Sequence, residues 1–77
     1  MIKNAILFTT PTCVNCKRVK LFLEQQSFPT EIIDATTLEG SKKAQDAGIQ
    51  SVPSVFLYDE TGTEHFARDI EGVEELL

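Results

Sequence analysis

Residues 5–16, AILFTTPTCVNC, combine the pattern of a strand with that of a helix around two cysteines. The stretch opens with a continuous apolar run over residues 5–9, which is typical of a strand covered on both faces. Residues 10–12, Thr-Pro-Thr, break that run, and from Cys13 to about Gln26 the apolar residues recur at helical spacing. The stretch therefore predicts a buried strand that leads directly into a helix, with a Cys-X-X-Cys pair in the first helical turn.

A second strand and a second helix are predicted to follow. The β-branched run at residues 30–34 predicts the strand. Residues 36–39 have the pattern of a capping box, which opens a helix, and Gly48 is placed to end it in the left-handed conformation. The predicted apolar face of this helix is thin and consists of Leu38, Ala44 and Ala47.

The last third of the chain predicts a hairpin and a short helix. Strands at residues 54–58 and 63–67 flank a turn at residues 59–62. The helix follows at residues 72–77, with Val73, Leu76 and Leu77 facing inward. The element order βαβαββα predicts one α/β domain over residues 1–77, with a four-stranded mixed sheet flanked by helices.

Composition and charge narrow the classes of function. Lys and Arg number 7 against 12 for Asp and Glu, and the formal net charge is −5, so no nucleic acid partner is expected. Residues 59–77 hold one basic and seven acidic residues, a pattern typical of a solvated helix face. No apolar run approaches the roughly 18 to 20 residues that cross a bilayer, so no membrane association is expected. The expectation is a cytoplasmic monomer, and two cysteines three apart in a reducing cytosol favour active thiols.

The position of the two cysteines indicates their chemistry. Unpaired N–H groups at a helix start carry positive partial charge, which favours a thiolate over a thiol. Cys13 is at this start, so it is the expected nucleophile, with a pKa below that of an ordinary thiol. Cys16 lies one turn further, on the apolar stripe, where it is shielded yet able to close a disulfide with Cys13. The pair is suited to a relay in which Cys13 attacks a substrate disulfide and Cys16 resolves the mixed disulfide.

Two other interpretations of the cysteine pair remain open at this point. Two thiolates supply half of a tetrahedral zinc site, and the chain has a single histidine, His65, on a predicted hairpin strand. The pair also fits an inert position in the core. We expect no metal site.

Two segments together resemble a known superfamily. Residues 8–17, FTTPTCVNCK, and residues 51–56, SVPSVF, are similar to the corresponding motifs of thioredoxin-fold redoxins, in particular glutaredoxins and the glutaredoxin-like NrdH redoxins that serve ribonucleotide reductase. The resemblance implies a thioredoxin-like fold and a dithiol–disulfide oxidoreductase with Cys13 and Cys16 as catalytic residues. It also implies a cis peptide bond before Pro53 and a substrate-binding surface formed by Thr10, Pro11, Thr12, Val52 and Pro53.

Departures from the family pattern bear on the reductant. Glutathione-using glutaredoxins carry a Lys shortly before the first cysteine and a Gly-Gly before the last helix, whereas this chain has Thr10 and no Gly-Gly. Arg68 or Lys42 are the available substitutes for those glutathione contacts. The absence of these glutathione contacts favours thioredoxin reductase as the electron donor, with glutathione as the alternative. The match to thioredoxin is also imperfect, because the chain has no Trp.

The resemblance also bears on cofactor and substrate. It implies a redox-active Cys13–Cys16 disulfide without a bound cofactor. The substrate is expected to be a protein disulfide, for which a ribonucleotide reductase is one candidate. A thiol-linked metal or iron–sulfur carrier is a more distant alternative, because some glutaredoxins share a cluster across a dimer.

Overall fold

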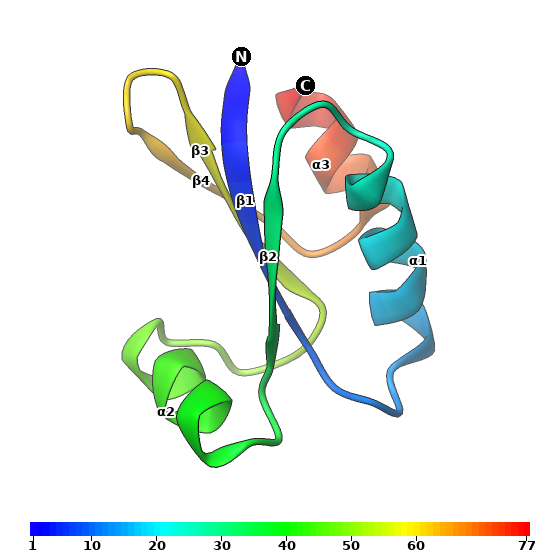
Figure 1. The fold of residues 1–77 in the computed structure, drawn as a ribbon, viewed down its shortest axis with the longest axis vertical. Coiled ribbons are helices and arrows are strands. Elements are labelled where there is room, and N and C mark those ends of the chain that lie inside the picture. The colour runs from blue at the N-terminus through cyan, green and yellow to red at the C-terminus, as the bar shows by residue number, and fades with distance from the viewer.

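Four strands and three helices alternate along the chain in the computed structural model, which describes residues 1–77 (Figure 1). In chain order they are β1 (Ile2–Thr9), α1 (Val14–Glu24), β2 (Thr30–Asp34), α2 (Leu38–Asp46), β3 (Ser54–Asp59), β4 (Glu64–Ala67) and α3 (Ile70–Leu76). The order βαβαββα is the predicted one. None of the three helices has the length and apolarity that a bilayer crossing requires.

The strands form one mixed sheet in the order β2-β1-β3-β4. β1 pairs in parallel with β2, and β3 pairs antiparallel with both β1 and β4. This is the thioredoxin-like arrangement expected from the sequence. Because β1 and β3 are adjacent and antiparallel, the residues that follow β1 and those that precede β3 meet at the same end of the sheet.

The core lies between the sheet and two helices. α1 and α3 lie on the same side of the sheet in Figure 1. Their buried residues, Val19 and Leu23 of α1 and Val73 of α3, pack against Leu7 and Leu57 of the central strands. The helical spacing predicted for α1 is confirmed, because Cys16, Val19 and Leu23 are buried on one face of the helix, whereas Leu21 is exposed. Docking of this stripe fixes the N-terminal turn of α1 at the end of β1.

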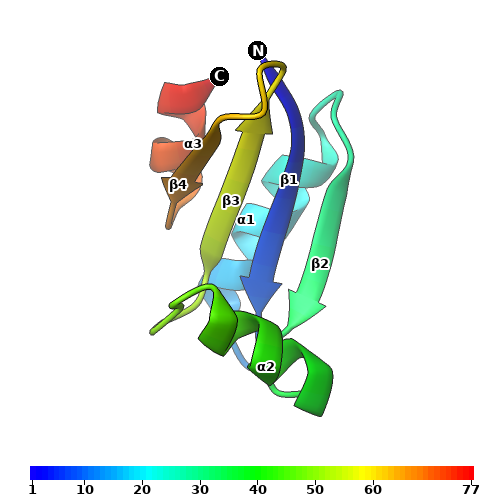
Figure 2. The same cartoon turned by 90° about the vertical axis from the view of Figure 1, so that its left-hand side faces the viewer.

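The opposite face of the sheet is only partly covered. Figure 2 shows α2 lying across its lower end, with the rest of that face open. Phe8, Phe56 and Phe66 pack against one another across this face: Phe8 meets Phe56 edge to face at a centroid distance of 6.0 Å, and the tilted rings of Phe56 and Phe66 are 5.3 Å apart. The arrangement gives β1 helices on both sides only near its carboxyl end, where the cysteines follow.

Several element boundaries differ from the predicted ones. β1 begins at Ile2, three residues early, because its antiparallel partner β3 continues to pair with it as far as Asp59. α1 ends at Glu24, two residues before the predicted end at about Gln26. α3 begins at Ile70, because the Asp69 side chain caps it by accepting a hydrogen bond from the Gly72 N–H at 2.7 Å.

The predicted details of α2 and of the last residue are corrected. Thr37, not Thr36, caps α2, and the residue three positions on is Gly40, so no capping box forms. Leu38 is 92% exposed and Ala47 is exposed, so Ala44 alone of the predicted face is buried. Leu77, predicted to face inward, is also exposed. Gly48 does end the helix region with a φ of 72°.

Candidate active site

Cys13 is the residue that begins α1. Its backbone is extended, with φ −86° and ψ 109°, and its N–H donates to the Thr10 carbonyl at 3.2 Å in a tight turn after β1. The Cys13 Sγ accepts a hydrogen bond from the Cys16 N–H at 3.1 Å. No acidic residue lies in the first turn, so the positive end of the helix faces the sulfur without a competing carboxylate.

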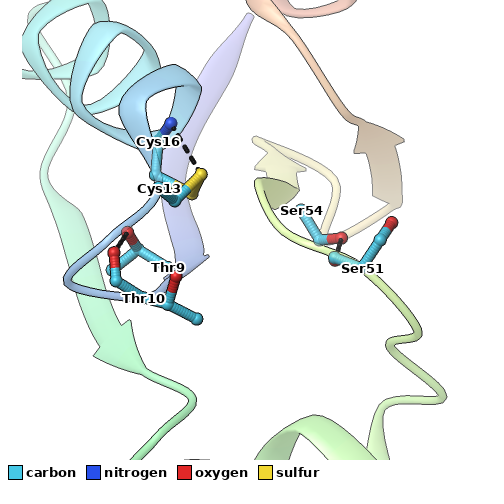
Figure 3. The surroundings of a disulfide bond; sticks show 6 residues. All are labelled: Thr9, Thr10, Cys13, Cys16, Ser51 and Ser54. Atoms are coloured by element: carbon cyan, nitrogen blue, oxygen red, sulfur yellow. Dashed lines mark hydrogen bonds between the residues drawn. A yellow bond between two sulfur atoms is a disulfide. The ribbon is translucent and has the colours of Figure 1, made fainter.

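Cys13 and Cys16 form a disulfide, with Cα atoms 5.2 Å apart (Figure 3). This separation lies within the usual range of about 4.4 to 6.8 Å. Cys13 is partly exposed, whereas Cys16 is 1% exposed and packs into the core. One cysteine therefore meets solvent and the other is shielded, which is the asymmetry expected from the helical stripe.

The loop that precedes β3 lies across from the disulfide. Figure 3 shows Ser51 and Ser54 on the side facing Cys13 and Cys16. The peptide bond between Val52 and Pro53 is cis, as the resemblance implied. Neither the N–H nor the C=O of Val52 takes part in a hydrogen bond within the chain. This loop, which lies across from the cysteine pair, therefore has a backbone donor and acceptor that are free to bind another molecule.

A cleft of about 470 Å³ runs between the cysteine turn, the Val52-Pro53 loop and the start of α3. Its lining residues include Asn15, Arg18, Pro53, Arg68 and Asp69. Asn15, between the cysteines, and Pro53 thus border one space, which brings the two sequence motifs together. The volume is within the range of small-molecule sites, about 300 to 1,000 Å³.

The charged side chains that line this cleft differ in whether they already have a partner within the protein. The Asp69 carboxylate is occupied by its cap on α3. Arg18 and Arg68 form no ion pair, although Arg68 stacks over the Phe66 ring at 5.6 Å from its centroid. Two guanidinium groups without an ion-pair partner therefore line the cleft, together with the carboxylates of Glu71 and Glu74.

The predicted site residues differ in their exposure. Pro11 and Thr12 are exposed, and Thr10, Val52 and Pro53 are partly exposed. Of the two side chains considered as substitutes for glutathione contacts, Arg68 lines the cleft, whereas Lys42 lies on α2 and does not.

The sequence analysis missed two further site features. Asn15 was not singled out as a lining residue, and Ser54 was seen only as the start of a strand. The position of Asn15 between the two cysteines could have identified it as a residue of the site. Nothing in the sequence pattern indicated that Ser54 is buried.

The groups with shifted pKa values lie away from the cleft. The Thr36 hydroxyl lowers the pKa of Asp34. Loss of hydration, followed by the Glu64 charge, raises the pKa of Tyr58. The Thr61 hydroxyl, together with His65, lowers the pKa of Asp59. His65 thus forms a hydrogen bond with Asp59 within the β3–β4 hairpin. No group of three or more His, Cys, Asp or Glu side chains is arranged to hold a metal ion.

Comparison with known proteins identifies the family. The Glutaredoxin family model matches residues 5–61, which include the cysteine pair, the cis-Pro loop, most of β1 and all of β2 and β3. The chain belongs to the glutaredoxin family. This redoxin is a thiol–disulfide oxidoreductase, and its redox-active centre is a disulfide. No curated protein sequence matches the chain.

Solved structures agree on the fold. Thioredoxin O1 from Arabidopsis thaliana superposes with a TM-score of 0.80 at 16% identity, over 97% of this chain and 74% of that one. Thioredoxin O2 from the same plant superposes with a TM-score of 0.75 at 16% identity, over 97% of this chain and 70% of that one. The oxidised C-terminal domain of DsbD from Neisseria meningitidis superposes with a TM-score of 0.56 at 18% identity, over 97% of this chain and 77% of that one. At these identities the likeness shows the thioredoxin fold of the glutaredoxin-family chain.

Proposed function

We propose that this redoxin reduces protein disulfides through a Cys13/Cys16 relay and is itself reduced by a flavin-dependent thioredoxin reductase. The observation that carries the proposal is the asymmetry of the disulfide: the partly exposed Cys13 caps α1, and the buried Cys16 lies one turn behind it. The proposal places the protein in a reducing compartment, the cytoplasm, where the dithiol form is maintained.

The relay conserves atoms and electrons. The Cys13 thiolate attacks one sulfur of the substrate disulfide, forming a mixed disulfide and releasing the other substrate sulfur as a thiolate. Cys16, after losing its proton, attacks the Cys13 sulfur, so that the Cys13–Cys16 disulfide forms and the second substrate thiolate leaves. Two electrons have then passed from the redoxin to the substrate, and NADPH returns two through the reductase.

The loop before β3 supplies the binding surface for the substrate. An extended substrate segment with its cysteine at Cys13 can pair with the free N–H and C=O of Val52 in the manner of an added strand. The exposed Pro11 and Thr12, with Thr10 and Pro53, flank the position of that segment. A backbone contact of this kind is independent of side-chain sequence, which suits a reductant of protein disulfides, a ribonucleotide reductase among the candidates.

Glutathione is a second candidate reductant, because the cleft that Asn15 of the cysteine turn borders is also lined by Arg18 and Arg68, which form no ion pair. Guanidinium groups bind carboxylates in a bidentate manner, and glutathione has two carboxylates. The absent Lys and Gly-Gly argue for thioredoxin reductase instead, since the chain lacks those two family contacts.

The test is insulin reduction by the purified protein with two electron sources in parallel. One contains NADPH and thioredoxin reductase; the other contains NADPH, glutathione and glutathione reductase. Turnover with the first alone supports the proposal. Turnover with the second alone overturns the proposed reductant, and an Arg68→Gln variant then shows a raised KM for glutathione if the cleft binds it. Absence of turnover with either overturns the proposed function.

A further inference from the structure

Ser54 is a buried polar residue that the relay does not use. It is 2% exposed and is the one polar side chain among the 14 buried residues. It begins β3, where its backbone pairs with Phe8 of β1, and it directly follows Pro53. Burial of a hydroxyl in an apolar core is unfavourable unless a hydrogen bond compensates it. The buried Ser54 hydroxyl is therefore expected to have a hydrogen-bond partner.

That partner is the carbonyl of Ser51. The Ser54 Oγ donates to the Ser51 carbonyl oxygen at 2.7 Å, as Figure 3 shows. Ser51 itself is exposed and belongs to no strand. The hydrogen bond, which we term the serine clasp, thus ties the loop residue before Val52 to the buried start of β3.

The serine clasp fixes the orientation of one peptide group. The Ser51 C=O and the Val52 N–H belong to the same planar peptide unit, and this unit is trans because the chain has a single cis bond, at Val52-Pro53. In a trans peptide the C=O and the N–H point in opposite directions. When the Ser51 C=O is held toward the buried Ser54 hydroxyl, the Val52 N–H must point away from the core.

We infer that Ser54 is a positioning residue, whose hydroxyl orients the Val52 N–H to donate to the backbone of a protein substrate. The inference rests on the proposed function. Without the clasp the Ser51–Val52 peptide can rotate, so the donor is oriented for only part of the time and substrate binding weakens. Reaction at Cys13 with a disulfide that has no peptide backbone is unaffected, because such a molecule has no acceptor for this N–H.

A matched pair of variants isolates the hydroxyl. Ser54→Thr keeps it and Ser54→Val replaces it with a methyl group, while both add the same bulk at a strand position that favours β-branched residues. Ser54→Ala removes the hydroxyl without adding bulk and provides the measurement if the larger side chains unfold the protein. The substrates are insulin and cystamine, a disulfide without peptide groups, and both are assayed with the electron source that supports insulin reduction by the unmodified protein.

The expected result is a split between substrates and between variants. Ser54→Val and Ser54→Ala raise the KM for insulin about three- to tenfold, the effect of one hydrogen bond, with kcat little changed. Their rates with cystamine stay within about twofold of the original protein, and Ser54→Thr behaves like the original protein with both substrates. A purely structural role lowers the melting temperature and does not separate insulin from cystamine.

Three outcomes overturn the inference: equal KM values for insulin in Ser54→Val and Ser54→Thr, an unchanged KM in Ser54→Ala, or equal losses with both substrates. Failure of the proposed function is recognised separately, because the unmodified protein then reduces insulin with neither electron source. In that case the clasp is examined by the carbonyl carbon shift of Ser51 in NMR spectra. Equal shifts in Ser54→Val and Ser54→Thr also overturn it.

Discussion

The Cys13 Sγ accepts the Cys16 N–H at 3.1 Å, so the side chain that caps α1 is also the candidate nucleophile. Helix caps are usually the oxygen atoms of Ser, Thr, Asp or Asn. Here sulfur takes that place, and the first turn has no acidic residue to neutralise the helix end. A negative charge on Cys13 after reduction therefore gains both a hydrogen bond and the favourable field of the helix.

The first prediction concerns the roles of the two sulfurs. Cys13→Ser lowers the rate of insulin reduction to the uncatalysed level, because the relay loses its attacking thiolate. Cys16→Ser retains the attack but accumulates a mixed disulfide, since nothing resolves it. Mass spectrometry of the Cys16→Ser protein after mixing with oxidised substrate measures the adduct. Reduction of insulin by Cys16→Ser at the original rate contradicts the dithiol mechanism.

The second prediction concerns the acidity of Cys13 in the reduced protein. We expect the start of α1 to favour the thiolate of Cys13, and we expect the buried Cys16 to be alkylated slowly. The rate of iodoacetamide modification at Cys13 thus levels off at a lower pH than the rate for free cysteine. Peptide mapping assigns the modified residue. Contradiction comes from a Cys13 profile that coincides with that of free cysteine.

Local pattern was sufficient for most of the elements and for the sulfur chemistry. β2 spans the predicted residues 30–34, and the N-cap position of Cys13 follows from the break at Pro11. The early start of β1 depended on pairing with Asp59, a contact from the far end of the chain. Leu38 is exposed because α2 meets only one end of the sheet, which helical periodicity does not encode.

Two features of the site could not be predicted from the sequence pattern, because they depend on contacts between separate segments of the chain. Ser54 is buried with its hydroxyl bonded to the Ser51 carbonyl, a contact between strand and loop, whereas serine is usually exposed. The cleft joins residues from α1, the loop and the start of α3. Such features depend on tertiary geometry, whereas the cysteine pair can be recognised from its spacing in the sequence.

The third prediction reverses a rule of helix propensity. Gly40 lies inside α2, where Ala is ordinarily more stable than Gly by about 1 kcal/mol. A Cβ on Gly40 would overlap the Asp34 carbonyl oxygen and lie 2.8 Å from the Thr37 Oγ1, the atom that caps the helix. Gly40→Ala therefore lowers the free energy of unfolding by about 1 to 3 kcal/mol, as measured by urea denaturation.

Ser41 provides the control for this prediction. It is in the same helix, and its side chain makes no hydrogen bond, so Ser41→Ala changes the free energy of unfolding by at most about 0.5 kcal/mol. If Gly40→Ala proves as stable as the original protein, the close approach of α2 to the end of β2 is wrong.

The fourth prediction concerns acid stability through Asp59. Its carboxylate accepts the Thr61 hydroxyl at 2.6 Å, meets the His65 Nε2 at 3.0 Å and accepts the Thr63 N–H, and the first of these is the largest cause of its lowered pKa. A carboxyl whose pKa is lower in the folded than in the unfolded protein stabilises the fold above its unfolded pKa of about 3.9 and loses that contribution as the pH falls further. Asp59→Asn is therefore less stable than the original protein at pH 7, and the difference narrows between about pH 4 and pH 2. Thermal unfolding of both proteins across this range measures it, and a difference that stays constant to about pH 2 excludes the ionised carboxylate as the cause.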